Sequence, residues 1–142
     1  MIALSVAQEH EGARVWATDI SQVAVEVAAE NTERLAFGEN VSVIEGDLLG
    51  GLPDDLRGRL DLVISNPPYI PTAALADLPA EVSGFEPRLA LDGGEDGLAV
   101  FRRLAAQASE WLAPDGVLCV ELDESRVRAA GDEALQWYVE VR

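Results

Sequence analysis

The stretch Leu60-Asp61-Leu62-Val63-Ile64-Ser65-Asn66-Pro67-Pro68-Tyr69 decides the fold class of this chain. Its first six residues form a short run rich in Leu, Ile and Val, which is the pattern of a strand buried in a parallel sheet. The two prolines cannot donate to a strand ladder, so the chain must leave the sheet directly after Ser65. The sequence therefore predicts a buried strand that ends in a rigid, polar turn.

Strand-like and helix-like segments alternate on both sides of this stretch. We predict further strands at residues 14–18, 41–44 and 117–122, and a last one from Trp137 to Val141. Helical periodicity covers residues 2–9, a segment that begins at the N-cap Ser21 and ends before Gly38, and residues 98–112 and 124–135. This β-α-β-α order predicts an α/β fold with a mostly parallel sheet.

The same patterns predict one helix face, one helix end and one long loop. The apolar face of the helix after Ser21 is marked by Val23, Val27, Ala28 and Leu35. The helix at 98–112 is expected to end at Pro114-Asp115-Gly116. Residues 70–97 contain three prolines and four glycines and are expected to form a loop, and a loop of this length inside a compact domain is usually functional.

Composition and charge exclude several classes of protein. The chain has 142 residues, of which 49% are hydrophobic, and its formal net charge is −16. So acidic a surface repels phosphate backbones, which disfavours direct nucleic-acid binding, and no apolar run is long enough to span a membrane. A single cysteine, Cys119, and a single histidine, His10, predict no metal site. The expected location is the cytoplasm, because the N-terminus has no secretory signal pattern.

Polar residues follow three of the predicted strands. Asp19, Asp47 and Asn66 each stand where a strand ends. In parallel α/β sheets, ligands bind at the carboxyl ends of the strands. These three residues are therefore candidates for a binding site, although an aspartate in this position can also make a local turn or cap a helix.

The tetrapeptide Asn66-Pro67-Pro68-Tyr69 has the groups needed to bind an amide. The Asn66 side-chain oxygen and the Pro67 carbonyl can accept the two N–H hydrogens of a substrate amide, which favours a nitrogen with an available lone pair. The fixed φ of consecutive prolines holds that carbonyl in place, and Tyr69 offers a flat face for stacking. The alternative interpretation is a simple strand-terminating turn.

The chain resembles the class I S-adenosylmethionine-dependent methyltransferases, and among them the peptide chain release factor glutamine N(5)-methyltransferase family. The motifs behind this resemblance are Asn66-Pro67-Pro68-Tyr69-Ile70-Pro71, Phe85-Glu86-Pro87, Leu89-Ala90-Leu91 and Gly93-Gly94-Glu95-Asp96-Gly97-Leu98. The resemblance implies a Rossmann-like, mostly parallel sheet and N-methylation of the glutamine in a release factor Gly-Gly-Gln motif, with S-adenosyl-L-methionine as cofactor. For Glu86 in the long loop, we favour a role in bracing the loop over the alternative of contact with the substrate.

The resemblance also assigns roles to single residues. Asn66, Pro67 and Tyr69 are the expected catalytic residues, and with Pro68 they form the substrate-binding set. Asp19 is expected to accept hydrogen bonds from the ribose hydroxyls, and Ile20 to cover the adenine. Asp47 is expected to accept from the adenine amino group and the Leu48 N–H to donate to a ring nitrogen, while Asn66 borders the cofactor.

Part of the family pattern has no counterpart in residues 1–142. The first, central strand and the glycine-rich loop that follows it are missing, and residues 129–142 do not match the pattern. We therefore interpret 1–142 as a single partial methyltransferase catalytic domain. The strands that end at Asp19 and Ser65 are expected to have unpaired edges, which favours self-association. Because the glycine-rich loop that would hold the methionine part of the cofactor is missing, we expect this chain to bind the cofactor weakly or not at all.

Two other functions remain open from the sequence alone. Amino methyltransferases of DNA and RNA share the Asn-Pro-Pro-Tyr tetrapeptide, but the charge of −16 and the Phe85-Glu86-Pro87 match count against them. An inactive, truncated methyltransferase-like domain is the second alternative. The favoured hypothesis is a protein glutamine methyltransferase whose partner is a release factor.

Overall fold

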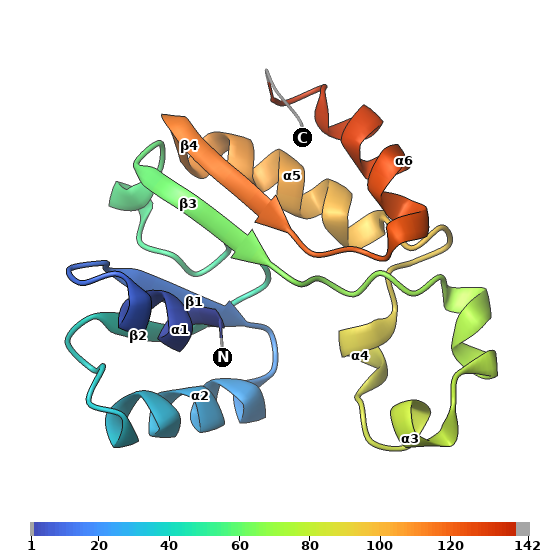
Figure 1. Ribbon diagram of the computed structural model, residues 1–142, viewed down its shortest axis with the longest axis horizontal. Coiled ribbons are helices and arrows are strands. Elements are labelled where there is room, and N and C mark those ends of the chain that lie inside the picture. The colour runs from blue at the N-terminus through green and yellow to red at the C-terminus, as the bar shows by residue number, and fades with distance from the viewer. Residues whose placement is uncertain (1, 139–142) are drawn as a thin grey trace. The chain divides into compact units, whose positions relative to one another are not determined.

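A computed structural model describes residues 2–138 of the chain, which forms two compact units, Met1–Leu56 and Arg57–Arg142 (Figure 1). The elements of the first unit are α1 (Ile2–Glu9), β1 (Val15–Asp19), α2 (Gln22–Arg34), β2 (Val41–Glu45) and the short 3-10 helix η1 (Asp54–Leu56). Those of the second are β3 (Leu60–Ser65), η2 (Thr72–Asp77), α3 (Ala80–Ser83), α4 (Arg88–Leu91), α5 (Ala99–Trp111), β4 (Leu112–Val120) and α6 (Glu124–Ala134).

In the first unit, β1 and β2 form a two-stranded parallel sheet covered by α2. The register runs from Val15 opposite Val41 to Asp19 opposite Glu45. Ser21 caps α2 as predicted, because its hydroxyl accepts a hydrogen bond from the Ala24 N–H at 3.4 Å. This capped helix returns the chain so that the second strand runs parallel to the first.

Of the residues that marked the apolar face in the sequence, Ala28 lies on the side of α2 that packs, whereas Val23, Val27 and Leu35 do not. Val23 and Val27 are 69% and 54% exposed, whereas Thr32 is buried and Ala28 is half-buried. Residues 24, 28 and 32 are spaced four apart, so they lie on one stripe of the helix. Small side chains on this stripe let the helix approach the sheet closely.

In the second unit, β3 and β4 form another parallel pair, and α5 and α6 supply the core. Ser65 stands opposite Val120 at the carboxyl end of the pair. The core cluster consists of Leu98, Phe101, Ala105, Ala130 and Ala134, with the half-buried Leu118, Val120 and Leu122 packed against it. Parallel pairing in both units, with helices between the strands, confirms the predicted α/β class.

Two boundaries in the second unit differ from the sequence prediction. The expected loop at 70–97 contains the three short helices η2, α3 and α4. The strand β4 begins at Leu112 instead of Val117 and ends at Val120, and Pro114 lies inside it. Leu60 pairs with Leu112 and Leu62 with Val117, so residues 113–116 form an irregularity opposite a single residue of β3. Pro114 therefore interrupts the ladder but does not shift the start of the strand to Val117.

Each strand has one hydrogen-bonded neighbour within the part of the chain that the structure describes. β1 pairs with β2, and β3 pairs with β4, so the strands ending at Asp19 and Ser65 each keep one edge without a ladder there. Trp137 lies in a turn, and the rest of the strand predicted at Trp137–Val141 lies beyond Tyr138, outside the described residues. No helix among residues 2–138 is long and apolar enough to cross a membrane.

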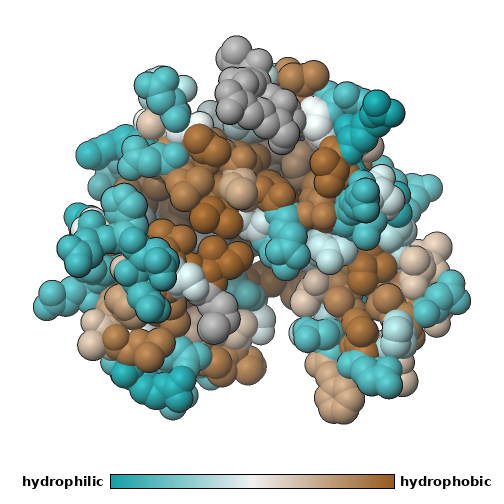
Figure 2. Space-filling model, in the orientation of Figure 1, coloured by the Kyte–Doolittle hydropathy of each residue, from teal (hydrophilic) through white to brown (hydrophobic). Residues whose placement is uncertain are grey.

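One face of the β3–β4 pair is apolar and exposed. Leu62 and Ile64 are 45% and 38% exposed, and their register partners Val117 and Cys119 are exposed too. Figure 2 shows hydrophobic residues over these two strands. Side chains alternate along a strand, so Leu118 and Val120 face the core and Cys119 faces the opposite way.

An ion-pair network on Arg102 joins α5 to α6 and to the preceding loop. The guanidinium donates to Glu133 on α6 and to Asp96. The hydrogen bond from Arg102 and one from the Leu98 N–H lower the pKa of Asp96 from 3.8 to about 2. This carboxylate therefore favours the folded state only while it is ionised.

We predict an acid-dependent loss of stability at Asp96. The folded pKa lies below the unfolded one, so the contribution is present above pH 3.8 and is lost as the pH falls toward 2. In Asp96→Asn, the free energy of unfolding should decrease less between pH 4 and pH 2 than in the wild type. Denaturant titrations at these pH values measure it, with Asp61→Asn, an exposed carboxylate without a side-chain hydrogen bond to any described residue, as the control.

Candidate active site

The first unit collects four predicted cofactor residues at one edge of its sheet. Asp19 ends β1 and is followed by Ile20, and Asp47 and Leu48 come directly after β2. The Gly46 N–H donates to the Asp19 carbonyl at 2.9 Å, which joins the two strand ends. Parallel pairing thus brings the residues of both strand ends together.

Asp19 makes a local turn and keeps further acceptor capacity. Its Oδ1 accepts the Ser21 N–H at 2.8 Å, as the local-turn interpretation requires. Its side chain is exposed, and Ile20 beside it is 49% exposed. A carboxylate has about four lone-pair sites, so this one hydrogen bond leaves room for ligand hydroxyls.

The turn after β2 holds Leu48 in an unusual conformation. Leu48 has φ +55°, the left-handed region that costs a residue with a side chain roughly 1–2 kcal/mol. The Thr18 hydroxyl donates to the Leu48 carbonyl at 2.6 Å and fixes the turn to β1. The Leu48 N–H has no acceptor among residues 2–138 and is available to a ligand. Such strained residues cluster at functional sites.

Glycines allow this turn to be so tight. A Cβ on Gly46 would lie 1.9 Å from the Gly50 carbonyl oxygen, a distance that no side chain tolerates. The Gly50 N–H in turn donates to the Asp47 carbonyl at 2.9 Å, so the turn expected from Gly46-Asp47 is present in the backbone. The Asp47 side chain remains exposed at the edge of the sheet.

In the second unit, the Asn66–Tyr69 segment leaves the end of β3 with both predicted acceptors unengaged. Asn66 is exposed and Pro67 is buried, so the rigid dipeptide anchors the carboxamide at the surface. Neither the Asn66 side chain nor the Pro67 carbonyl has a hydrogen-bond partner among the described residues. Two consecutive residues thus offer acceptors that a ligand with two N–H hydrogens can engage in place of water.

The backbone after Asn66-Pro67-Pro68 is fixed by the glycine-rich stretch 93–97. The Ile70 N–H donates to Leu91 at 3.0 Å, and the Gly93 N–H donates to Ile70 at 2.8 Å. A Cβ on Gly93 would lie 2.8 Å from the Tyr69 Cα, and one on Gly97 would lie 2.3 Å from the Tyr69 carbonyl oxygen. Both positions therefore need glycine because the Tyr69 backbone lies against them.

Asp92 braces this arrangement and was not singled out from the sequence. It accepts the Thr72 hydroxyl at 2.6 Å, the Gly94 N–H at 3.1 Å and two N–H groups of Arg88. The Thr72 hydrogen bond is the largest cause of its lowered pKa. The expectation for Glu86 was wrong, since its side chain makes no hydrogen bond or ion pair with residues 2–138. The Asp92-Gly93-Gly94 turn sequence is the signal by which Asp92 could have been found.

The strand before Asn66 is not buried as predicted, because only Val63 of β3 is buried and the β3–β4 pair has one exposed face. Parallel pairing, polar residues at strand ends and an Asn-Pro-Pro-Tyr turn directly after β3 are together typical of a Rossmann-like class I methyltransferase. Residues 1–78 match the family model described as "Methyltransferase small domain", and the chain belongs to this family. The matched region contains both strand ends of the first unit and the Asn66–Tyr69 segment.

Curated relatives narrow the similarity further. A release factor glutamine methyltransferase of Moorella thermoacetica is 48% identical over 134 residues, which cover 94% of this chain and 46% of the relative. Another release factor glutamine methyltransferase, of Gloeobacter violaceus, is 45% identical over a region that covers 85% of this chain and 41% of the relative. A ribosomal protein uL3 glutamine methyltransferase of Bradyrhizobium diazoefficiens is 44% identical over a region that covers 88% of this chain and 38% of the relative. The chain thus spans less than half the length of these relatives.

Proposed function

We propose that residues 1–142 are part of the catalytic domain of a protein glutamine N-methyltransferase that uses S-adenosyl-L-methionine. The observation that carries this proposal is the pair of free acceptors, the Asn66 carboxamide oxygen and the Pro67 carbonyl. The substrate class is supported by the names of the relatives, which are all glutamine methyltransferases.

The free acceptors suit an amide because an amide nitrogen is a poor nucleophile. Its lone pair is delocalised into the carbonyl, and it becomes available when the nitrogen turns pyramidal. Two fixed acceptors that take both N–H hydrogens hold the nitrogen in that geometry, while Tyr69 packs against the planar group. The nitrogen can lose its proton after the transfer, so no dedicated general base is required.

The first unit has groups that fit the adenosine part of the cofactor. The Asp19 carboxylate can accept from ribose hydroxyls, the exposed Ile20 can cover the adenine, and the Leu48 N–H can donate to a ring nitrogen. Asp47 stands at the same edge and can accept from the adenine amino group. When bound, S-adenosylmethionine supplies an electrophilic methyl group on a sulfonium sulfur.

We propose a peptide chain release factor, through its Gly-Gly-Gln glutamine, as the protein substrate. The net charge of −16 favours a basic protein surface over a nucleic acid. Ribosomal protein uL3 is the competing substrate, because relatives named for it are similar at 44% identity.

Methyl transfer to defined substrates tests the proposal. Residues 1–142 in their full-length context and methyl-labelled cofactor are incubated with a release factor, with uL3, and with DNA or RNA. Mass spectrometry then locates the methyl group. We expect a single methyl on the release factor glutamine and none when that glutamine is replaced by asparagine. Methylated nucleobases, or cofactor binding without any transfer, would contradict the proposed function.

Two substitutions of Asp19 separate its ligand role from its turn. Asp19→Asn keeps an oxygen for the Ser21 N–H but removes the charge, so cofactor affinity should fall about tenfold with little change in thermal stability. Asp19→Ala should weaken binding about a hundredfold and also lower stability. Calorimetric titration with cofactor measures the affinity, and Asp115→Asn is the matched control. Unchanged affinity in Asp19→Ala would remove Asp19 from the site.

A further inference from the structure

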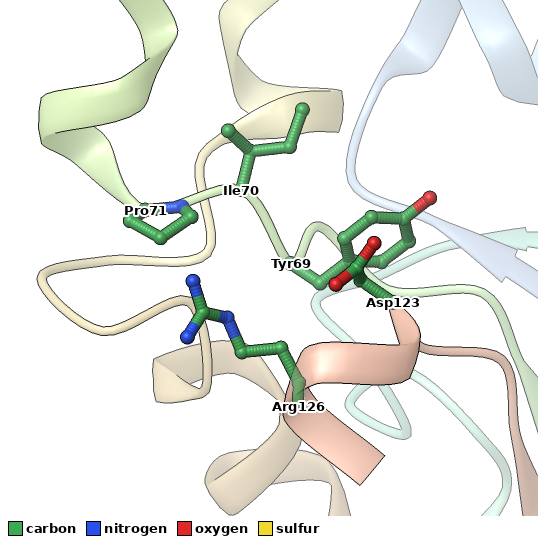
Figure 3. A pocket seen from close by; sticks show the side chains of 5 residues that line it. All are labelled: Tyr69, Ile70, Pro71, Asp123 and Arg126. Atoms are coloured by element: carbon green, nitrogen blue, oxygen red, sulfur yellow. The ribbon is translucent and has the colours of Figure 1, made fainter.

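A cavity within the second unit lies beside the Asn66–Tyr69 segment. It has a volume of about 190 Å³ and is lined by Tyr69, Ile70, Pro71, Asp123 and Arg126 (Figure 3). Pockets for whole drug-sized ligands hold roughly 300–1,000 Å³, so this one suits a smaller group. Because Tyr69 lines it, whatever fills the cavity lies next to the proposed amide site.

Arg126 brings unsatisfied donors to this cavity. It is half-buried and extends from α6 toward Pro71 (Figure 3). Its guanidinium makes no hydrogen bond or ion pair with any residue from 2 to 138, whereas Arg88 and Arg102 are paired with carboxylates. A guanidinium has five N–H donors, so a half-buried one without an acceptor is suited to an incoming oxygen.

Gly97 leaves room for this guanidinium as well as for Tyr69. A Cβ at Gly97 would come within 3.3 Å of the Arg126 Nε. The position of Arg126 therefore depends on the same glycine that fixes the Tyr69 backbone.

Asp123 supplies the complementary acceptor. It caps α6, and its Oδ1 accepts the Ser125 N–H at 3.0 Å and the Ser125 hydroxyl. These hydrogen bonds lower the pKa of Asp123, and the nearby charge of Arg126 lowers it to a smaller extent, so the carboxylate is ionised at neutral pH. Its second oxygen accepts no hydrogen bond from residues 2–138 and is open to a donor.

A polypeptide main chain offers the acceptor and the donor that this pair requires. A peptide carbonyl matches the Arg126 fork, and a peptide N–H matches the Asp123 carboxylate. A free anion would bind Arg126 but would be repelled by Asp123. A protonated amine would bind Asp123 but would be repelled by Arg126. A small cavity with one donor group and one acceptor group therefore fits one or two peptide units.

We propose that this cavity binds the main chain of the substrate next to the methylated glutamine, with Arg126 donating to a peptide carbonyl and Asp123 accepting a peptide N–H. This proposal rests on the proposed function and deepens it. These contacts involve no substrate side chain. They therefore favour a glutamine whose neighbouring residues are small enough to enter the cavity, such as glycines.

Steady-state kinetics with a short peptide that contains Gly-Gly-Gln tests the proposal. Contacts away from the reacting atoms act mainly on KM. We expect Arg126→Gln to raise KM for the peptide about 10- to 100-fold with kcat changed less than about threefold. Arg128→Gln, an exposed position on the same helix, is the matched control and should leave KM unchanged. An equal increase in KM for the two variants would overturn the proposal, because the increase would then result from the change in net charge alone.

A modified peptide tests the role of Asp123. Replacing the amides that flank the glutamine by esters removes their N–H groups. Asp123→Asn keeps an oxygen for Ser125 but lacks the charge, so it should raise KM for the amide peptide and leave KM for the ester peptide unchanged. The same increase for both peptides would contradict the assigned contact.

Direct binding separates failure of this proposal from failure of the proposed function. If the chain methylates no glutamine, the proposed function fails, and the cavity is then judged by the NMR signal of the Arg126 Nε–H. A saturable shift of this signal on adding the amide peptide supports the main-chain contact. The absence of a shift at millimolar peptide overturns it.

Discussion

Replacing Asn66 by alanine is expected to reduce methyl transfer at least 100- to 1,000-fold while cofactor affinity changes little. The reason is that its carboxamide oxygen is one of the two free acceptors to which we assign the positioning of the substrate amide. Removing one positioned hydrogen-bonding group of an active site typically costs this much in kcat. Single-turnover transfer assays, run beside cofactor titrations, measure the two quantities separately.

The exposed Asn40 provides a matched control for Asn66. Its side chain makes no hydrogen bond to residues 2–138, so Asn40→Ala should leave the transfer rate unchanged. Near-normal transfer by Asn66→Ala would refute the role given to this residue. Loss of cofactor binding together with transfer would instead show that Asn66 acts mainly on the cofactor.

Replacing Gly97 by alanine is expected to destabilise the second unit by roughly 2–5 kcal/mol. The backbone there has φ +80°, which costs an alanine roughly 1–2 kcal/mol. The new Cβ would also stand 2.3 Å from the Tyr69 carbonyl oxygen, and forcing such a contact apart typically costs about 1–3 kcal/mol. Because Tyr69 must move, methyl transfer should fall as well. Urea unfolding monitored by circular dichroism gives the stability change.

Gly58 separates the two contributions at Gly97. It also has a left-handed backbone, with φ +67°, but nothing lies within 4 Å of the position of its Cβ. Gly58→Ala should therefore show the conformational cost alone, about 1–2 kcal/mol. Equal destabilisation by both substitutions would mean that the Tyr69 backbone is not held against Gly97.

Local patterns in the sequence predicted most of the elements. Short apolar runs bounded by Asp19 and Ser65 became parallel strands, and Ser21 became the N-cap of α2. These features depend on side-chain alternation and capping within a few residues, so the sequence contains the information directly. The free acceptors of Asn66 and Pro67 also agree with the amide site proposed from the tetrapeptide.

Features that depend on distant partners could not be predicted in this way. The packed side of α2 is the small-residue stripe through Ala28 and Thr32, although Val23 and Val27 are more hydrophobic. Likewise, β4 begins at Leu112, because Leu112 pairs with Leu60, while Pro114 lies in the unpaired residues 113–116 of the register shift. In both cases tertiary contacts decided between alternatives that local propensity ranked the other way.

The sequence by itself determined the fold class and the strand ends that carry Asp19, Asp47 and Asn66, and it motivated the amide site that we propose at the Asn66–Tyr69 segment. Only the tertiary structure decided what holds that segment in place. Gly93 and Gly97 come against the Tyr69 backbone from more than 20 residues away, and Arg126 reaches the same place from α6. The physical reason is that a close backbone approach or an unpaired guanidinium depends on which distant segments meet, and local residue patterns contain no record of that.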